Sequence, residues 1–191
     1  RLGLPAAFIE TAWRRYTKHS RNKAQEIQGA IEPLASTYSN AAPFKGAILA
    51  GVFTKGALTQ LSSLGFKVLF FSYASVIGAF SNEGIDAQFD EATSEGEFQK
   101  KIDRWNRLTA LQRRNIAKGL IKLNRADVDD FLSALSVAIL RRIDQIIILP
   151  LFGTTTEVGN VLEAIAYLEN FDERPGSATL RAYEIFLRYS N

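Results

Sequence analysis

The sequence has 191 residues, of which 47% are hydrophobic and 23% charged, and its formal net charge at pH 7 is +3. This length and composition are typical of a globular protein with a packed core, and they exclude a disordered or fibrous chain. Because there is no cysteine, disulfides, thiolate zinc sites, iron–sulfur clusters and cysteine nucleophiles are excluded. The one histidine, His19, excludes multi-histidine metal sites and argues against a Ser–His catalytic triad.

Membrane insertion and secretion are not indicated by the sequence. No stretch has the roughly 18 to 20 consecutive apolar residues that a membrane span needs, and the longest candidate, residues 146–153, is interrupted by Pro150. The first residues lack the apolar core and cleavage pattern of a secretory signal. We therefore expect a cytoplasmic protein with no membrane partner.

The first element in chain order is predicted to be a long helix over residues 5–34. Phe8, Ala12 and Tyr16 recur at four-residue steps, and apolar residues at three- and four-residue steps return before residue 34. Pro33 lies where this pattern ends, as expected near the end of a helix.

The next segment, residues 44–82, predicts a strand–helix–strand core. The apolar run AILAGVF at 47–53 and the run FKVLFF at 66–71 are typical of strands buried on both faces. Helical segments are expected at 55–64 and 74–80. Strands and helices that alternate at this pitch predict parallel strands joined by right-handed crossovers.

Three helices are predicted over residues 94–141, and Ser94 with Glu97 and Thr109 with Gln112 form possible capping boxes. A second strand–helix–strand segment follows over 143–190, its helix opened by Thr154 with Glu157. The fold class predicted is α/β: one domain over 1–191 with a mainly parallel or mixed sheet of about four strands flanked by helices. The segment 94–141 is then a helical insertion between the second and third strands.

Charge is distributed unevenly along the chain. Residues 100–125 contain nine basic residues and one acid, whereas residues 83–97 contain six acids and no base. At about 100° per residue, Arg114, Lys118, Lys122 and Arg125 fall on one side of a helix, opposite apolar residues. Such a surface suits a polyanion, since each cation near a phosphate displaces a condensed counterion. The predicted nucleic-acid contacts, which we call the basic ridge, are Arg104, Arg107, Arg114, Lys118, Lys122 and Arg125.

The alternative interpretation of the basic ridge is an ordinary solvated helix surface beside neutralising acids. Trp13, Tyr16 and Trp105 are interleaved with basic residues and can stack on unpaired bases, although aromatic residues at helical spacing usually belong to a core.

The acidic segment offers a candidate metal site at Asp86, Asp90 and Glu91. Mg²⁺ takes one or two carboxylates together with phosphate oxygens and water, so it is the cofactor expected if the protein is a nuclease. A solvated acidic loop explains the same residues without a metal.

The segment FKGAILAGVFTKGALTQLSSLGFKVLFFSY at residues 44–73 resembles the second half of the restriction-endonuclease-like core of the PD-(D/E)XK superfamily. In that family a catalytic strand is followed by a helix and another strand. The resemblance implies metal-dependent phosphodiester hydrolysis. No Pro-Asp followed by an acid-x-Lys strand is found, so no catalytic residue is carried over.

The leading hypothesis is a nucleic-acid-binding protein, either a restriction-endonuclease-like protein acting on DNA or a non-catalytic relative. The main alternative is a protein-interaction or oligomerisation module without catalytic activity, with a homodimer as one form of it. A small-molecule enzyme that uses the carboxyl ends of the strands is a third. Two carboxylates and a lysine that converge beside the first strand would favour hydrolysis, whereas their absence would leave binding.

Overall fold

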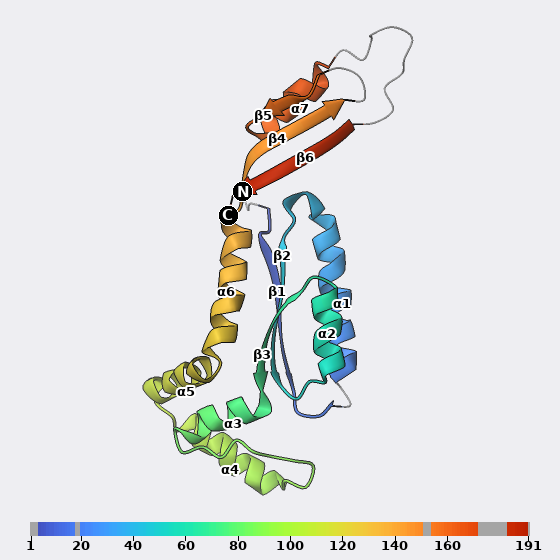
Figure 1. The fold of residues 1–191 in the computed structure, drawn as a ribbon. Helices are drawn as coiled ribbons and strands as arrows, with labels where there is room; N and C mark the ends of the chain where they lie inside the picture. The colour runs from blue at the N-terminus through green and yellow to red at the C-terminus, as the bar shows by residue number, and fades with distance from the viewer. Residues whose placement is uncertain (1–3, 18–19, 151–153, 172–182, 191) are drawn as a thin grey trace. The chain divides into compact units, whose positions relative to one another are not determined.

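The computed structural model describes residues 4–17, 20–150, 154–171 and 183–190. Its contacts divide the chain into two compact units, residues 1–139 and 140–191. Each unit has a three-stranded sheet of its own (Figure 1). The prediction of one folding domain over the whole chain stays a prediction.

The first unit begins with a strand, so the helix expected over residues 5–34 is wrong in its first part. β1 is Ala7–Arg14 and α1 is Ser20–Thr37, with a short 3₁₀ turn at Ser39–Ala41. The residues that suggested four-residue steps also alternate, since side chains on one side of β1 are half-buried and most on the other are exposed. Pairing of these residues with β2, which is distant in the sequence, stabilises the strand and with it the two-residue alternation. Pro33 lies inside α1, where it removes one backbone N–H donor without ending the helix, which continues to Thr37.

The sheet of the first unit is parallel, with the order β1-β2-β3. β2 is Phe44–Gly51, α2 is Lys55–Ser63 and β3 is Lys67–Ser72. Ala7 lies beside Phe44 at one end of the β1–β2 ladder and Arg14 beside Gly51 at the other. The predicted parallel strand–helix–strand core is therefore confirmed, with β1 as an additional strand.

Helices α1 and α2 cover one face of this sheet (Figure 1). Ile27 and Ile31 of α1 and Leu61 of α2 are buried against Leu49 of β2, and Leu49 and Leu61 have no exposed surface. Burying side chains of this size contributes about 1.5–3 kcal/mol each, so this layer is the main apolar core of the unit.

Helix α6, Arg125–Leu140, packs on the opposite face of the sheet. Its Val128 and Phe131 contact Leu69 and Phe71 of β3, and the ring of Phe131 meets that of Phe44 edge-on at 5.5 Å. The sheet is thus sandwiched between α1 and α2 on one face and α6 on the other.

Three further helices connect β3 to α6: α3 (Tyr73–Ser81), α4 (Glu95–Asn106) and α5 (Ala110–Leu123). Both predicted capping boxes are confirmed, that of Ser94 and Glu97 on α4 and that of Thr109 and Gln112 on α5. A smaller core joins α3, α5 and the segment near Ile85. Residues 85–89 form neither a helix nor a strand.

The second unit has an antiparallel sheet of order β5-β4-β6. β4 is Arg142–Pro150, β5 is Thr156–Val158 and β6 is Tyr183–Ser190. The helix predicted to open at Thr154 is wrong in its start, because β5 pairs with β4 there and α7, Val161–Glu169, is capped by Asn160 instead. Ile146 and Ile148 of β4 pack on Ala164 of α7.

The α/β fold class is confirmed, but the single sheet of about four strands is wrong. Helices α4, α5 and α6 lie where the helical segment was predicted, but they join two separate sheets. Among the residues described, no helix is both long enough and apolar enough to span a membrane.

A core substitution tests the packing of α6 on the sheet. Phe131→Ala should lower the free energy of unfolding by about 3–5 kcal/mol, because Phe131 is 2% exposed and its removal leaves a cavity between α6 and β3. Urea denaturation followed by circular dichroism measures the change. The matched control is Leu111→Ala on α5, where the side chain is 63% exposed and the change should stay within about 0.5 kcal/mol. Equal costs for both variants would contradict this packing.

Candidate functional site at the carboxyl edge of the parallel sheet

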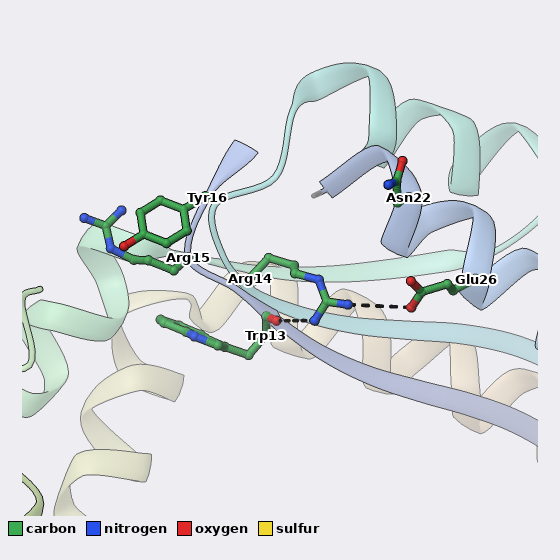
Figure 2. Close-up of a pocket in the computed structure, with 6 residues that line it drawn as sticks. All are labelled: Trp13, Arg14, Arg15, Tyr16, Asn22 and Glu26. Carbon is green, nitrogen blue, oxygen red and sulfur yellow. Dashed lines mark hydrogen bonds and ion pairs between the residues drawn. The ribbon is translucent and has the colours of Figure 1, made fainter. Parts of the chain in front are cut away.

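Four charged side chains of β1 and α1 converge on the helix-covered side of the sheet. The Lys23 ammonium lies 3.6 Å from a Glu10 carboxylate oxygen and 3.3 Å from a Glu26 oxygen. The Arg14 guanidinium lies 3.6 Å from the same Glu26 oxygen, as Figure 2 shows. We call Glu10, Arg14, Lys23 and Glu26 the strand–helix charge cluster. It satisfies the condition set from the sequence, since two carboxylates and a lysine meet beside the first strand.

The cluster is partly shielded from water and balanced in charge. The exposed fraction of its side chains runs from 17% for Lys23 to 56% for Glu26. Two carboxylates face two cations, so none of the four charges is left uncompensated. Partial burial strengthens these interactions relative to fully exposed pairs, which contribute about 0–1 kcal/mol.

A hollow of about 430 Å³ opens beside the cluster. Figure 2 shows Arg14 and Glu26 between the end of β1 and the first turns of α1. The residues around the hollow come from the end of β1, the turn after it and α1: Trp13, Arg14, Arg15, Tyr16, Asn22 and Glu26.

Arg15 is held at the edge of this hollow by aromatic rings and a carbonyl group. Its guanidinium lies 4.1 Å from the centre of the Tyr73 ring and 5.4 Å from that of Phe89. Its Nε donates a hydrogen bond of 2.7 Å to the Phe89 carbonyl. A cation fixed in this way fits recognition of a planar or anionic group, although these contacts also lock the turn after β1 to α3.

The hollow lies where the parallel strands end, which is the edge at which open α/β sheets bind ligands. The ends of β1 and β2 approach closely here: a Cβ atom at Gly51, where φ is +102°, would lie 2.0 Å from the Arg14 carbonyl oxygen. Glycine is therefore required at this position of β2.

The six residues of the basic ridge are all exposed, but they do not form one site. Lys118, Lys122 and Arg125 surround a surface hollow of about 420 Å³ with Ile121, and Arg114 lies one turn before Lys118 on α5. Arg104 is on α4, and Arg107 is the first residue after the end of α4. Neither of these two residues lines this hollow.

In the part of the chain that the structure describes, the acidic segment lies against one residue of the basic ridge, since the Arg104 guanidinium is beside Gly84. One described ion pair joins the acidic segment to the basic one, between Asp86 and Lys101, which is not a ridge residue. Of the six ridge residues, Arg125 alone has a described acidic partner, Asp129, at 2.7 Å on its own helix. On α5, Arg114, Lys118 and Lys122 are exposed, and no acidic partner is described for them.

The first turn of α3 connects these two regions of the first unit. Tyr73 contacts Arg15, and its ring centre lies 6.1 Å from that of Trp13. Two residues later, the Ser75 hydroxyl bonds at 3.3 Å to the amide oxygen of Asn124, which separates Lys122 from Arg125. Helix α3 therefore contacts both the turn after β1 and the junction of α5 and α6.

The candidate metal residues have local partners. Asp86 accepts a 2.6 Å hydrogen bond from Lys101, and Asp90 accepts bonds from the Ala92 N–H group and the Thr93 hydroxyl. Among the described residues, no group of three or more His, Asp or Glu side chains is placed to hold a metal ion, so Asp86, Asp90 and Glu91 do not form one. A metal at this segment stays a prediction without structural support.

The aromatic residues singled out from the sequence are partly packed. The Trp105 ring is 5.6 Å from that of Phe80, with the Arg113 guanidinium 5.1 Å from its centre, and Trp105 is 36% exposed. Trp13 and Tyr16 line the hollow after β1. His19 lies outside the described residues.

Sequence reasoning missed the strand–helix charge cluster because it placed Glu10 on a helix together with Lys23 and Glu26. The available signal was the alternation in AFIETAWR, in which Phe8, Glu10, Ala12 and Arg14 share one side of a strand.

Comparison with known proteins adds no further assignment: no family model, no curated protein and no solved structure matches the chain.

The pair between Asp86 and Lys101 gives a pH-dependence that can be measured. The hydrogen bond from Lys101 lowers the pKa of Asp86 below its ordinary value of 3.8, and bonds from Ser94 lower the pKa of Glu97 below 4.5. Both carboxylates therefore favour folding above these ordinary values, and the contribution is lost as the pH falls through the lowered pKa values. In Lys101→Met, the pKa of Asp86 should rise toward 3.8 in an NMR titration.

Glu97 is the internal control in the same titration, because its pKa is lowered mainly by Ser94 and should change much less. An Asp86 pKa that stays as low in Lys101→Met as in the parent protein would contradict the assigned cause.

Proposed function

We propose that this protein binds nucleic acid through the exposed cations of α5 and the start of α6. The observation that carries this proposal is the hollow surrounded by Lys118, Lys122 and Arg125, with Arg114 one turn away; of these four cations, Arg125 has a described acidic partner, Asp129. The phosphate backbone is the polyanion that such a spacing of cations suits, because each contact releases a counterion. Contacts of this kind position the backbone and carry no sequence information.

Contacts with α3 and with the sheet hold the helices that carry these cations in position. Ser75 and Asn124 tie the junction of α5 and α6 to α3, and Val128 and Phe131 anchor α6 on the sheet. The cationic side chains are flexible, but the helices that bear them are not free to separate. A phosphate chain lying along α5 would thus be held next to the ends of β1 and β2.

Substitution of the cations on α5 tests binding. Arg114→Ala, Lys118→Ala and Lys122→Ala together should weaken binding of a DNA duplex and reduce the salt slope of its affinity by up to about 2.7, at about 0.9 per phosphate contact. Fluorescence anisotropy over a range of NaCl concentrations measures both quantities.

The matched control removes the same net charge from other exposed positions, by Lys55→Ala, Lys100→Ala and Arg142→Ala. It should bind nearly as the parent protein does. If the control loses as much affinity as the α5 variant, net charge and not the α5 surface explains the binding; if the parent protein binds no nucleic acid, the proposal fails.

A second candidate function is metal-dependent hydrolysis of a phosphodiester at the strand–helix charge cluster. The observation that favours it is the convergence of Glu10, Glu26 and Lys23 beside an edge strand. The segment that resembles the PD-(D/E)XK superfamily, residues 44–73, forms β2, α2 and β3 and does not include these three residues. The cluster also lacks the acid-x-Lys strand of that family, because residue 12 is alanine and the lysine comes from α1.

The donor set of the cluster fits Mg²⁺ in chemical type. Mg²⁺ is commonly held by one or two carboxylates, with water and phosphate oxygens as its other ligands, and Glu10 and Glu26 supply two carboxylates. When bound, the ion would polarise the phosphate group. Lys23 would offer an ammonium group to the negative charge on the phosphate, and Arg14 would keep Glu26 oriented.

Neutral isosteres separate hydrolysis from binding. Glu10→Gln and Glu26→Gln should each abolish Mg²⁺-dependent nicking of plasmid DNA, because a metal-binding carboxylate is lost while the fold and the α5 surface remain. Agarose gel analysis of supercoiled plasmid with Mg²⁺ measures the nicking.

Glu32→Gln is the matched control, since Glu32 is also on α1 and pairs with Lys45 of β2 at 2.7 Å, away from the cluster. This variant should nick plasmid at the rate of the parent protein. Activity that survives Glu10→Gln would remove the cluster from the reaction, and a parent protein that binds DNA without nicking it would leave binding as the function.

A further inference from the structure

One side of β1 is an open sheet edge in the described part of the molecule. β2 pairs with β1 over all eight residues, and no described strand pairs with the other side. An edge of this length is a template for pairing with another strand, and proteins protect such edges with charged side chains, especially lysine, with inward-pointing charges, with proline or with a bulge. The segment AFIETAWR contains neither proline nor lysine, and its register with β2 is unbroken, but it has two charged residues, Glu10 and Arg14.

The direction of the backbone groups identifies the residues that face this open edge. The carbonyl groups of Ala6 and Arg14 accept hydrogen bonds from Phe44 and Val52, so the even-numbered residues point their backbone groups toward β2. Backbone groups alternate along a strand, and those of Ile9, Thr11 and Trp13 therefore point outward. The Trp13 carbonyl accepts a bond from the Arg14 guanidinium, which leaves its second lone pair available.

The side chains of these three residues lie on the face opposite α1. Ile9 and Trp13 are 38% and 39% exposed, although they are large apolar residues in the middle of a strand. Helix α6 covers this face over β2 and β3 but does not bury them. Glu10 and Arg14, the charged residues of β1, lie on the other side, toward α1, and so do not shield this face.

We propose that β1 pairs with β1 of a second copy of this chain, antiparallel, with Thr11 on the twofold axis. In this register Ile9 lies opposite Trp13 of the second copy, and Trp13 lies opposite its Ile9. Ile9 and Trp13 of each strand thus contact Trp13 and Ile9 of the other copy. Each such cross-strand pair contributes roughly 0.2–1 kcal/mol. The outward backbone groups of Ile9, Thr11 and Trp13 form hydrogen-bonded pairs with those of the second copy, and two three-stranded sheets become one sheet of six strands.

The self-complementary pattern favours a second copy over an unrelated strand. Two apolar residues placed symmetrically about Thr11 fit their own image in an antiparallel ladder, which an isologous twofold interface requires. The proposal does not depend on nucleic-acid binding, because the dimer forms from the protein alone. It also leaves the cationic hollow of α5 out of the interface.

Single cysteines test the register directly, since the chain has no cysteine of its own. In Thr11→Cys the two Cα atoms would be about 5.5 Å apart, within the about 4.4–6.8 Å span of disulfides. Mild oxidation should therefore convert most of this variant to a covalent dimer on a non-reducing gel. In the control Ile9→Cys the two cysteines would be about 14 Å apart and should remain unlinked.

A non-covalent readout accompanies the cross-link. Sedimentation of the parent protein should show a dimer that dissociates on dilution, and Ile9→Lys should shift it to monomer while its circular dichroism spectrum stays unchanged. A parent protein that is monomeric at all concentrations, or Ile9→Cys that cross-links as readily as Thr11→Cys, would overturn the proposal. Neither outcome bears on DNA binding, which is measured separately.

Discussion

The parallel pairing of β1 with β2 positions most of the chemistry of this molecule. It holds Glu10 and Arg14 against α1, where Lys23 and Glu26 meet them, and it brings the Arg14 carbonyl so close to Gly51 that only glycine fits there. The turn that follows β1 carries Arg15 onto the ring of Tyr73 at the start of α3. Without this pairing the four charges of the cluster would be spread along a helix surface and would have no hollow beside them.

Electrostatics in the first unit divides into balanced and unbalanced regions. The strand–helix charge cluster compensates two carboxylates with two cations, and Lys45 and Glu32 compensate each other nearby. The α5 surface differs, since Arg114, Lys118 and Lys122 have no described acidic partner. A balanced, half-buried cluster holds β1 and α1 together, whereas unbalanced, exposed cations suit long-range attraction of a polyanion. The cluster lies on the α1 side of the sheet, whereas α6, which follows α5, packs on the opposite face.

Local signals predicted the helices well because their causes are local. The capping boxes at Ser94 and Thr109 join residues three positions apart. The alternating strands and helices of residues 44–82 predicted parallel pairing for the same reason, since a short crossover allows little else. Prediction failed at β1 and β5, where the partner strand is distant: Phe8 and Ala12 fit a helix or a strand equally, and only pairing with β2 decides between them.

The amino-acid sequence by itself determined the α/β class, the unequal distribution of charge and the exclusion of thiolate and multi-histidine chemistry, because these depend on composition and on neighbours in the chain. Tertiary structure decided which charges meet. Glu10 and Lys23 are thirteen positions apart, and whether they share a site depends on the strand that Glu10 joins. It also decided that the six strands form two sheets and that one edge of β1 has no described strand beside it. Strand pairing is a contact between distant segments, so its outcome is set by the competition among all possible partners and not by any one segment.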